Sequence, residues 1–239
     1  MRLSNKEKSK NIFLNYYNID LFNYELKMLA ELFRKYIKPT KYLLDAGCGR
    51  RQVWLKNKLP FAFGVDIDFD DLNENSFYNN KVCSDMSKLP FADSVFDNII
   101  SVYTMEHIEK PSLVFNEFVR VVNCDGYLFL IVPNRYSIYG IAASLLPVFA
   151  QNYIWRMFKG KMQPHKVYYR ANTLRKLKKL GSKCGLSICE CKMLECPNLW
   201  LLEIPSLFRL SVYFQKFMNN IDCMKYFRSL IVLVMQKKS

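Results

Sequence analysis

The spacing of apolar residues changes from a helical to a strand-like pattern within the first quarter of the chain. Apolar residues first recur every three or four positions over 20–37, which predicts an amphipathic helix that ends before Pro39. Two short apolar runs follow, 42–46 and 61–65, with a helical pattern at 53–57 between them. A strand, a helix and a second strand in this order indicate a βαβ unit.

The alternation of strands and helices continues along the rest of the chain. A helix is predicted over 112–122, after Pro111. A basic helix over 172–181 is expected to begin at Asn172 and to end at Gly181. Further strands are predicted at 82–83, 98–102, 127–132, 186–194 and 228–235. Together these elements predict an α/β fold: a Rossmann-like, seven-stranded and mostly parallel sheet with helices on both faces and an inserted helical cap.

We expect one domain built from four consecutive segments. A chain of 239 residues with 51% hydrophobic side chains can bury a complete core. The segments are an N-terminal helical segment (1–39), a cofactor-binding core (40–135), an apolar and basic cap insertion (136–183) and C-terminal strands that complete the sheet (184–239).

The net charge of +14 lies almost entirely in the second half of the chain. Residues 1–120 hold 17 basic and 16 acidic side chains, whereas residues 121–239 hold 18 and 5. No acidic residue occurs between Asp125 and Glu190. Such a region attracts anions, so nucleic acid, an anionic membrane surface and an acidic substrate are all compatible partners, and so is an ordinary solvated basic face.

Cysteine usage and the apolar segments indicate the compartment. The eight cysteines lie mostly in apolar runs, which favours reduced thiols in a cytoplasmic protein. No signal peptide is apparent in the first residues. The uncharged stretch 136–155 is interrupted by Pro147 and polar residues, so we expect an interfacial or buried helix, and peripheral rather than spanning contact with a membrane.

The candidate binding motif is the glycine turn after the first predicted strand, at Asp45, Ala46, Gly47, Cys48 and Gly49. Glycines at this place let the backbone touch a ligand at the carboxyl ends of the strands. Asp66 ends the second predicted strand nineteen residues after Gly47, the spacing at which a carboxylate can hold a ribose diol.

Electrostatics distinguishes between two nucleotide-type ligands. A dinucleotide fingerprint would have a glycine where Gln52 stands, and Asp45 would lie close to a doubly charged pyrophosphate. S-adenosylmethionine has no phosphate and carries an ammonium and a sulfonium, so an acid at position 45 favours it.

These residues resemble the class I S-adenosylmethionine-dependent methyltransferases, in particular the small-molecule group that includes the ubiquinone and menaquinone biosynthesis methyltransferases. The turn at 45–49 resembles the first motif of that family, Gly64-Val65-Asp66 the second, and Ser84-Asp85-Met86 the third. The likeness continues through Met105-Glu106-His107-Ile108 and covers about residues 40–135. It implies an enzyme that methylates oxygen or carbon of a small or lipid-linked acceptor.

The resemblance also implies a role for each cofactor-binding residue. Asp66 would bind the ribose hydroxyls, Asp85 the adenine amino group, and Met86 would pack on the adenine ring. The 45–49 turn would bind the methionine portion, and Ile67 and Tyr103 are further expected contacts. His107, just beyond the fourth strand, is the candidate general base, and His165 in the cap is the other histidine that could take a proton. For His107 the residues favour the role of a satisfied loop histidine over that of a base.

Several features leave alternatives open. Arg50-Arg51 stand where the family often has a glycine, so either arginine could reach the cofactor carboxylate, or the chain could be a non-catalytic relic. The four cysteines between 184 and 196 lack zinc-type spacing and are expected to be buried core thiols, with no metal.

The acceptor must be inferred from the cap insertion, which is apolar and then basic. Aromatic and cationic side chains are mixed there, as in an interface helix or a lipid-binding lid, and a lid packed on its own core is the alternative. RNA gripped by the same cations is the competing acceptor, although no RNA-binding module is evident. The oligomeric state is left open by the sequence.

Overall fold

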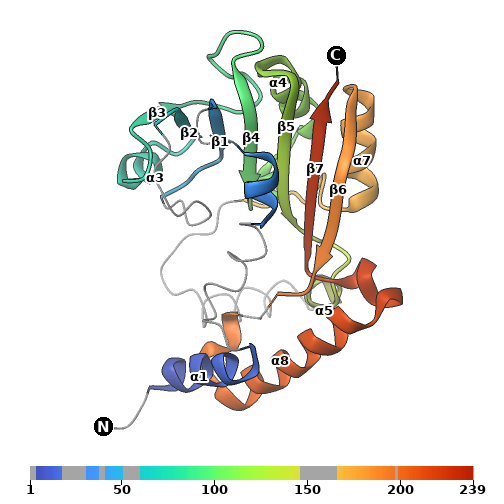
Figure 1. Cartoon of the computed structure of the whole chain (residues 1–239). Helices are drawn as coiled ribbons and strands as arrows, with labels where there is room; N and C mark the ends of the chain where they lie inside the picture. The colour runs from blue at the N-terminus through green and yellow to red at the C-terminus, as the bar shows by residue number, and fades with distance from the viewer. Residues whose placement is uncertain are drawn as a thin grey trace. The chain divides into compact units, whose positions relative to one another are not determined.

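The computed structural model describes residues 4–17, 31–37, 41–50, 60–145, 166–196 and 199–238 (Figure 1). It contains a seven-stranded sheet in the order β3-β2-β1-β4-β5-β7-β6. The strands are β1 (Leu43–Ala46), β2 (Ala62–Asp66), β3 (Asn80–Cys83), β4 (Phe96–Val102), β5 (Val122–Pro133), β6 (Leu186–Leu194) and β7 (Leu230–Lys237). Each overlaps a strand predicted from the sequence, and the expected α/β sheet is confirmed.

The strands from β3 to β5 run parallel to their neighbours. Leu43 of β1 pairs with Ala62 of β2 on one side and with Asn98 of β4 on the other. The β2–β3 and β4–β5 pairs are parallel as well, whereas the arrows of β6 and β7 point in opposite directions (Figure 1). Because parallel strands end at the same edge, the loops after β1, β2, β3 and β4 come together there.

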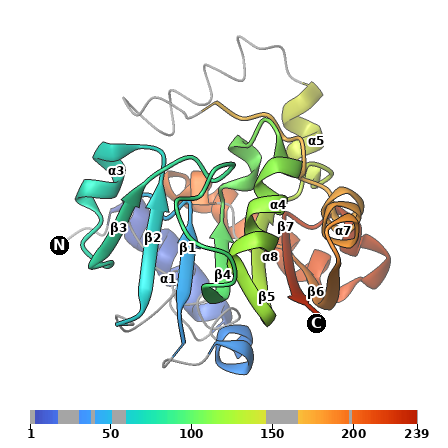
Figure 2. The same cartoon turned by 90° about the horizontal axis from the view of Figure 1, so that it is seen from above.

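Helices cover both faces of the sheet, as expected for parallel strands with two buried faces. Residues 31–36 form a helix whose Phe33 ring lies 5.6 Å from the ring of Phe129 in β5. On the opposite side of the sheet lies α4 (Pro111–Val121), beside α7 (Leu174–Lys183) (Figure 2). The helix α4 buries Phe115 and Phe118. Alternate residues of β5 therefore face different helices.

The bounds of α7 differ from the prediction at both ends. Thr173, not Asn172, caps the helix, because its hydroxyl accepts the amide of Lys176 at 3.3 Å. Gly181 lies inside the helix and is buried, and a β-carbon there would collide with the Met235 sulfur. The glycine with a left-handed backbone is Gly185, at φ +78°.

By their internal contacts the described residues form two compact units. The sheet unit takes its described residues from 30–135, 165–192 and 231–239. The helical unit takes them from 1–29, 136–164 and 193–230. The sheet unit also contains α3 (Phe69–Glu74) and a short 3-10 helix, η1 (Met105–His107). The division of the chain into four segments of one domain stays a prediction.

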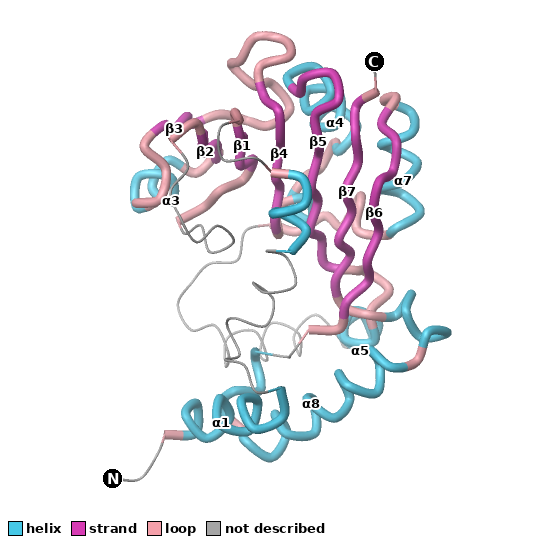
Figure 3. The backbone as a smooth tube through the Cα atoms, in the orientation of Figure 1, coloured by secondary structure: helices cyan, strands magenta, loops and turns pink. Residues whose placement is uncertain are grey.

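The helical unit is built around two helices that lie side by side, α1 (Asn5–Tyr17) and α8 (Pro205–Asn220) (Figure 3). Phe13 of α1 packs with Phe208 and Val212 of α8 in a buried cluster. The unit also contains α5 (Ile138–Leu145) and the 3-10 helices η2 (Leu199–Glu203) and η3 (Asp222–Phe227). Between β6 and β7, which complete the sheet, the chain forms η2, α8 and η3, three elements that the sequence analysis did not predict.

Some predicted elements fall outside the described residues. These are most of the 20–37 helix, the helix at 53–57 and cap residues 146–165. None of the described helices combines the length and hydropathy that crossing a bilayer requires.

Candidate functional site

The predicted site residues lie at the carboxyl ends of β1, β2, β3 and β4, within the sheet unit. Two hydrogen bonds join the loop after β1 to the end of β2, from the amides of Gly47 and Cys48 to the Val65 carbonyl at 2.8 and 3.0 Å. The Ser84 amide, after β3, donates to the Asp66 carbonyl at 2.9 Å. The topology thus brings together motifs that are far apart in the sequence.

The two glycines of the first loop have different structural roles. Gly47 has φ +83°, and a β-carbon there would collide with Thr104 at the end of β4. Gly49 has φ +51°, but a β-carbon there would have no neighbour within 4 Å among the described residues. Gly47 therefore permits close packing of two strands, whereas Gly49 leaves exposed backbone beside open space, where a ligand can approach.

Asp66 is held in place by backbone amides at the end of β2. One carboxylate oxygen accepts the Gly49 amide at 2.8 Å and the other accepts the Asp68 amide at 3.0 Å. Each oxygen keeps a second lone pair, so the carboxylate can still accept two ribose hydroxyls. Ile67 follows with 70% of its surface exposed, as expected for an apolar residue that a flat ring could cover.

Asp45 does not face the open side of the loop. Its carboxylate is 3% exposed and accepts the Tyr78 hydroxyl at 2.5 Å. Burial raises its pKa to about 7, against the lowering effect of the Tyr78 hydrogen bond. In the structure Asp45 pairs with Tyr78 beneath the loop, and its direct contact with a cationic ligand stays a prediction.

The other loop residues are also placed by their surroundings. Cys48 is buried, and burial raises the pKa of its thiol, so it stays protonated. Ala46 is fully buried at the end of β1. Asn75 donates from its side chain to the Gly49 carbonyl at 2.8 Å and so fixes the turn from the other side.

Asp85 and Met86 open the turn after β3. Asp85 is exposed, and its carboxylate accepts the Ser87 amide at 2.7 Å. This turn-forming contact leaves the second oxygen available to accept from an amine. Met86 is 7% exposed and packs into the interior.

Tyr103 and Thr104 continue the site beyond β4. Tyr103 has φ +53°, a left-handed conformation that costs energy for a residue with a β-carbon, and its amide is fixed by the Ile131 carbonyl at 2.9 Å. The Thr104 hydroxyl donates to the Gly47 carbonyl at 3.3 Å.

His107 contacts the segment that begins at Lys166. Its Nδ1 lies 2.9 Å from the Lys166 carbonyl. Because a carbonyl only accepts, Nδ1 must carry the proton, and Nε2 has the lone pair when the ring is neutral. The Glu106 carbonyl also accepts the amides of Tyr168 and Tyr169, at 2.7 and 3.2 Å.

Tyr169 borders this part of the site. It is partly exposed and has φ +49°. Burial, and next the nearby Glu106 carboxylate, raise the pKa of its phenol, so it remains a hydroxyl donor at neutral pH.

Arg50 is paired with two carboxylates. Its guanidinium lies 2.5 Å from Asp71 and 3.4 Å from Glu74, both on α3. That Arg50 or Arg51 reaches the cofactor carboxylate stays a prediction. Arg51 and His165 lie outside the described residues.

The cysteines from 184 to 196 are not core thiols. Cys189 is exposed, and Cys184, Cys191 and Cys196 are partly exposed. Only Cys189 and Cys191 belong to β6, and the prediction of buried core thiols was wrong for all four. In the described part of the chain, no group of three or more His, Cys, Asp or Glu side chains could hold a metal ion.

Three supporting residues were missed from the sequence: Thr104, Asn75 and Tyr78. Each acts through a contact with a residue at least 26 positions away, so no local pattern could identify it.

The arrangement fits S-adenosylmethionine. Gly49 has no side chain to block a ligand, Asp66 has spare acceptors for a diol, and Ile67 is an exposed apolar surface.

Comparison with known proteins agrees with this geometry. Residues 44–130 match the methyltransferase domain family. An uncharacterized protein of Methanocaldococcus jannaschii is 28% identical over 131 residues, which cover 53% of this chain and 57% of that protein. A 24-methylenesterol C-methyltransferase of Arabidopsis thaliana is 28% identical over 117 residues, 44% of this chain and 32% of that protein.

A solved structure shares the fold. Geranyl diphosphate C-methyltransferase of Streptomyces coelicolor A3(2), in complex with Mg²⁺, geranyl diphosphate and S-adenosyl-L-homocysteine, superposes with a TM-score of 0.55 at 12% identity. The match covers 96% of this chain and 83% of that one. By contrast, the chain spans 57% of the Methanocaldococcus jannaschii protein and 32% of the Arabidopsis thaliana enzyme.

Proposed function

We propose that this chain, whose residues 44–130 match a methyltransferase domain, is a class I S-adenosylmethionine-dependent methyltransferase that methylates oxygen or carbon of a small-molecule acceptor. The observation that carries the proposal is the pairing of Gly49 with Asp66. The Gly49 amide donates to the carboxylate at the end of β2 at 2.8 Å, so a residue without a side chain and a diol acceptor lie side by side.

The chain's own residues have two tasks in this reaction. S-adenosylmethionine, when bound, supplies a methyl group attached to a sulfonium sulfur, and the neutral thioether that remains after transfer is the leaving group. The loop from Gly47 to Gly49, Asp66 and Asp85 bind and orient the nucleoside. The segment from Tyr103 to His107 then orients the acceptor in line and excludes water, and such alignment accounts for much of the acceleration of a displacement.

His107 is the proposed general base. The Lys166 carbonyl fixes its tautomer, which leaves the basic nitrogen Nε2 to take a proton from an acceptor hydroxyl or carbon acid. Tyr169, which stays protonated, would orient the acceptor by donating a hydrogen bond.

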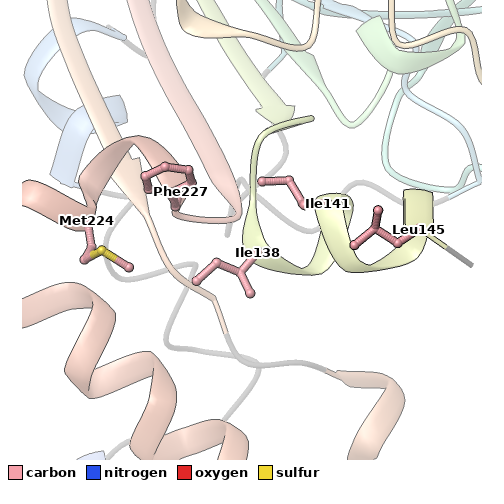
Figure 4. Close-up of a pocket in the computed structure, with 5 residues that line it drawn as sticks. All are labelled: Ile138, Ile141, Leu145, Met224 and Phe227. Atoms are coloured by element: carbon pink, nitrogen blue, oxygen red, sulfur yellow. The ribbon is translucent and has the colours of Figure 1, made fainter.

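We also propose that the acceptor is lipid-linked, of the quinone-precursor type or similar, and that the protein meets it at a membrane from the cytoplasm. The names of two similar proteins support this, a sterol C-methyltransferase and a geranyl diphosphate C-methyltransferase. The helical unit contains a hollow of about 330 Å³ with an entirely apolar lining (Figure 4). Its lining residues are Ile138, Ile141, Leu145, Met224 and Phe227.

Transfer of a labelled methyl group tests this function. The protein is incubated with methyl-labelled S-adenosylmethionine and, separately, with a lipid extract, a water-soluble extract and RNA. We expect label in the lipid fraction, and none with Asp66→Ala. Label in RNA alone would contradict the proposed acceptor, and no label in any fraction would contradict the enzymatic proposal.

A further inference from the structure

The exposed side of α8 carries a row of large apolar side chains. Leu207, Leu210, Tyr213 and Phe217 are 45%, 65%, 51% and 54% exposed. At 3.6 residues per turn, these four fall within about one third of the helix circumference and extend over about 15 Å of its length. We call them the α8 stripe. A contiguous exposed apolar patch of this kind marks an interaction surface.

The buried side of α8 fixes the direction in which the stripe points. Phe208 and Val212 are fully buried against Phe13 of α1. Gln215 is 1% exposed and donates from its side chain to the Glu195 carbonyl at 3.0 Å. The helix therefore cannot rotate the stripe inward without breaking this core.

The charges on α8 favour an anionic partner. The helix contains no acidic residue, and its two charged side chains are Arg209 and Lys216. They lie seven positions apart, on the same side of the helix and beside the stripe. Long cationic side chains at the edge of an apolar face can reach lipid phosphates while their stems stay in contact with apolar surface.

A second copy of the chain is a poorer occupant of this surface. Four half-exposed side chains of this size offer roughly 400 Å². That is about half of the surface that each partner buries in a stable interface. The net charge of +14 also opposes self-association but favours an anionic surface.

We propose that α8 binds the surface of an anionic phospholipid membrane, with the α8 stripe among the headgroups and Arg209 and Lys216 at the phosphates. This inference rests on the proposed membrane association and is independent of the proposed methyl transfer. It assigns membrane contact to a helix that the sequence did not single out, in place of the 136–183 cap.

Vesicle flotation tests the proposal with the full chain. Phosphatidylcholine vesicles with and without phosphatidylserine are compared, using the parent, the double variant Leu210→Ser with Phe217→Ser, and the control Leu113→Ser. Leu113 is a comparably exposed leucine, at 44%, on α4 of the sheet unit. We expect the parent and the control to float with the anionic vesicles and the double variant to lose at least about tenfold in partitioning.

Two further measurements keep the result interpretable. Thermal melting should be nearly unchanged in the double variant, because both positions are exposed. Cofactor affinity should also be unchanged, so that loss of membrane binding with intact cofactor binding bears only on α8. Equal flotation of the double variant and the parent would overturn the proposal. So would a parent that forms a dimer which the double variant converts to a monomer.

Discussion

The side chain of Thr104, at the end of β4, fills the space that a β-carbon on Gly47 would need, and its hydroxyl donates to the Gly47 carbonyl at 3.3 Å. The glycine loop is thus fixed by the neighbouring strand as well as by its own sequence. The geometry of the proposed cofactor site depends on this packing, and the two glycines of the loop should respond differently to substitution.

Gly47→Ala should destabilise the protein by about 1–3 kcal/mol, because the new β-carbon collides with Thr104 and φ is +83°. Gly49→Ala should cost about 1 kcal/mol for its positive φ, since in the described part of the chain no neighbour lies within 4 Å of the new β-carbon. Thermal melting measures both changes.

The cofactor affinity of the same two variants separates folding from binding. Gly49→Ala should fold and yet bind S-adenosylmethionine at least about tenfold more weakly, because its methyl group enters the open side of the loop. Binding by Gly49→Ala with unchanged affinity would mean that the ligand does not approach this backbone.

Tyr78→Phe should lower stability at neutral pH. The substitution removes the donor to Asp45, whose carboxylate is 3% exposed, and leaving a buried carboxylate without this bond costs about 1–3 kcal/mol. The Tyr78 bond lowers the pKa of Asp45, so its loss should raise that pKa further. Denaturant unfolding at pH 5 and pH 8 should show the larger loss at pH 8, and an equal loss at both would contradict this pairing.

Glu195 in the helical unit should make stability depend on pH. Burial raises its pKa from 4.5 to about 7, so the folded state binds its proton more tightly than the unfolded state. The resulting stabilisation is present below about pH 4.5 and is lost as pH rises through 7. Glu195→Gln removes this titration. As pH rises from 4.5 to 8, the free energy of unfolding of the variant should increase relative to that of the parent by on the order of 1–3 kcal/mol.

Chemical denaturation across that pH range checks the Glu195 prediction. The Ser229 amide donates to the Glu195 side chain at 2.8 Å, and a glutamine oxygen can accept the same bond. A stability difference between Glu195→Gln and the parent that does not vary with pH would contradict the prediction.

His107→Gln should slow methyl transfer by about 10²–10⁴-fold if the acceptor loses a proton. The variant removes the basic nitrogen that the Lys166 carbonyl leaves with a lone pair. Cofactor affinity should stay the same. A variant with an unchanged rate would show that His107 has only a structural role in its loop.

The sequence predicted the strands and the glycine loop of the site better than the contacts between its side chains. The strands and the glycine loop are visible locally, because buried parallel strands are short apolar runs and Gly47 requires a positive φ. The directions of Asp45 and Arg50 depend on Tyr78 and Asp71, which are 33 and 21 positions away. One-dimensional spacing does not contain that information.

The helix α8 was missed for a different reason. Its buried face contains Ser211 and Gln215, while its exposed face contains Leu210 and Phe217. This distribution weakens the apolar periodicity by which an amphipathic helix is recognised.

Isothermal titration with S-adenosylmethionine tests the central claim most directly. The matched control for Asp66→Ala is Asp97→Ala, since Asp97 also accepts a backbone amide, that of Tyr42 at 3.0 Å, but begins β4 at the opposite edge of the sheet. We predict micromolar binding by the parent and by Asp97→Ala, and at least about a tenfold loss in Asp66→Ala. Binding by Asp66→Ala with the affinity of the parent, or no binding by the parent, would contradict the account.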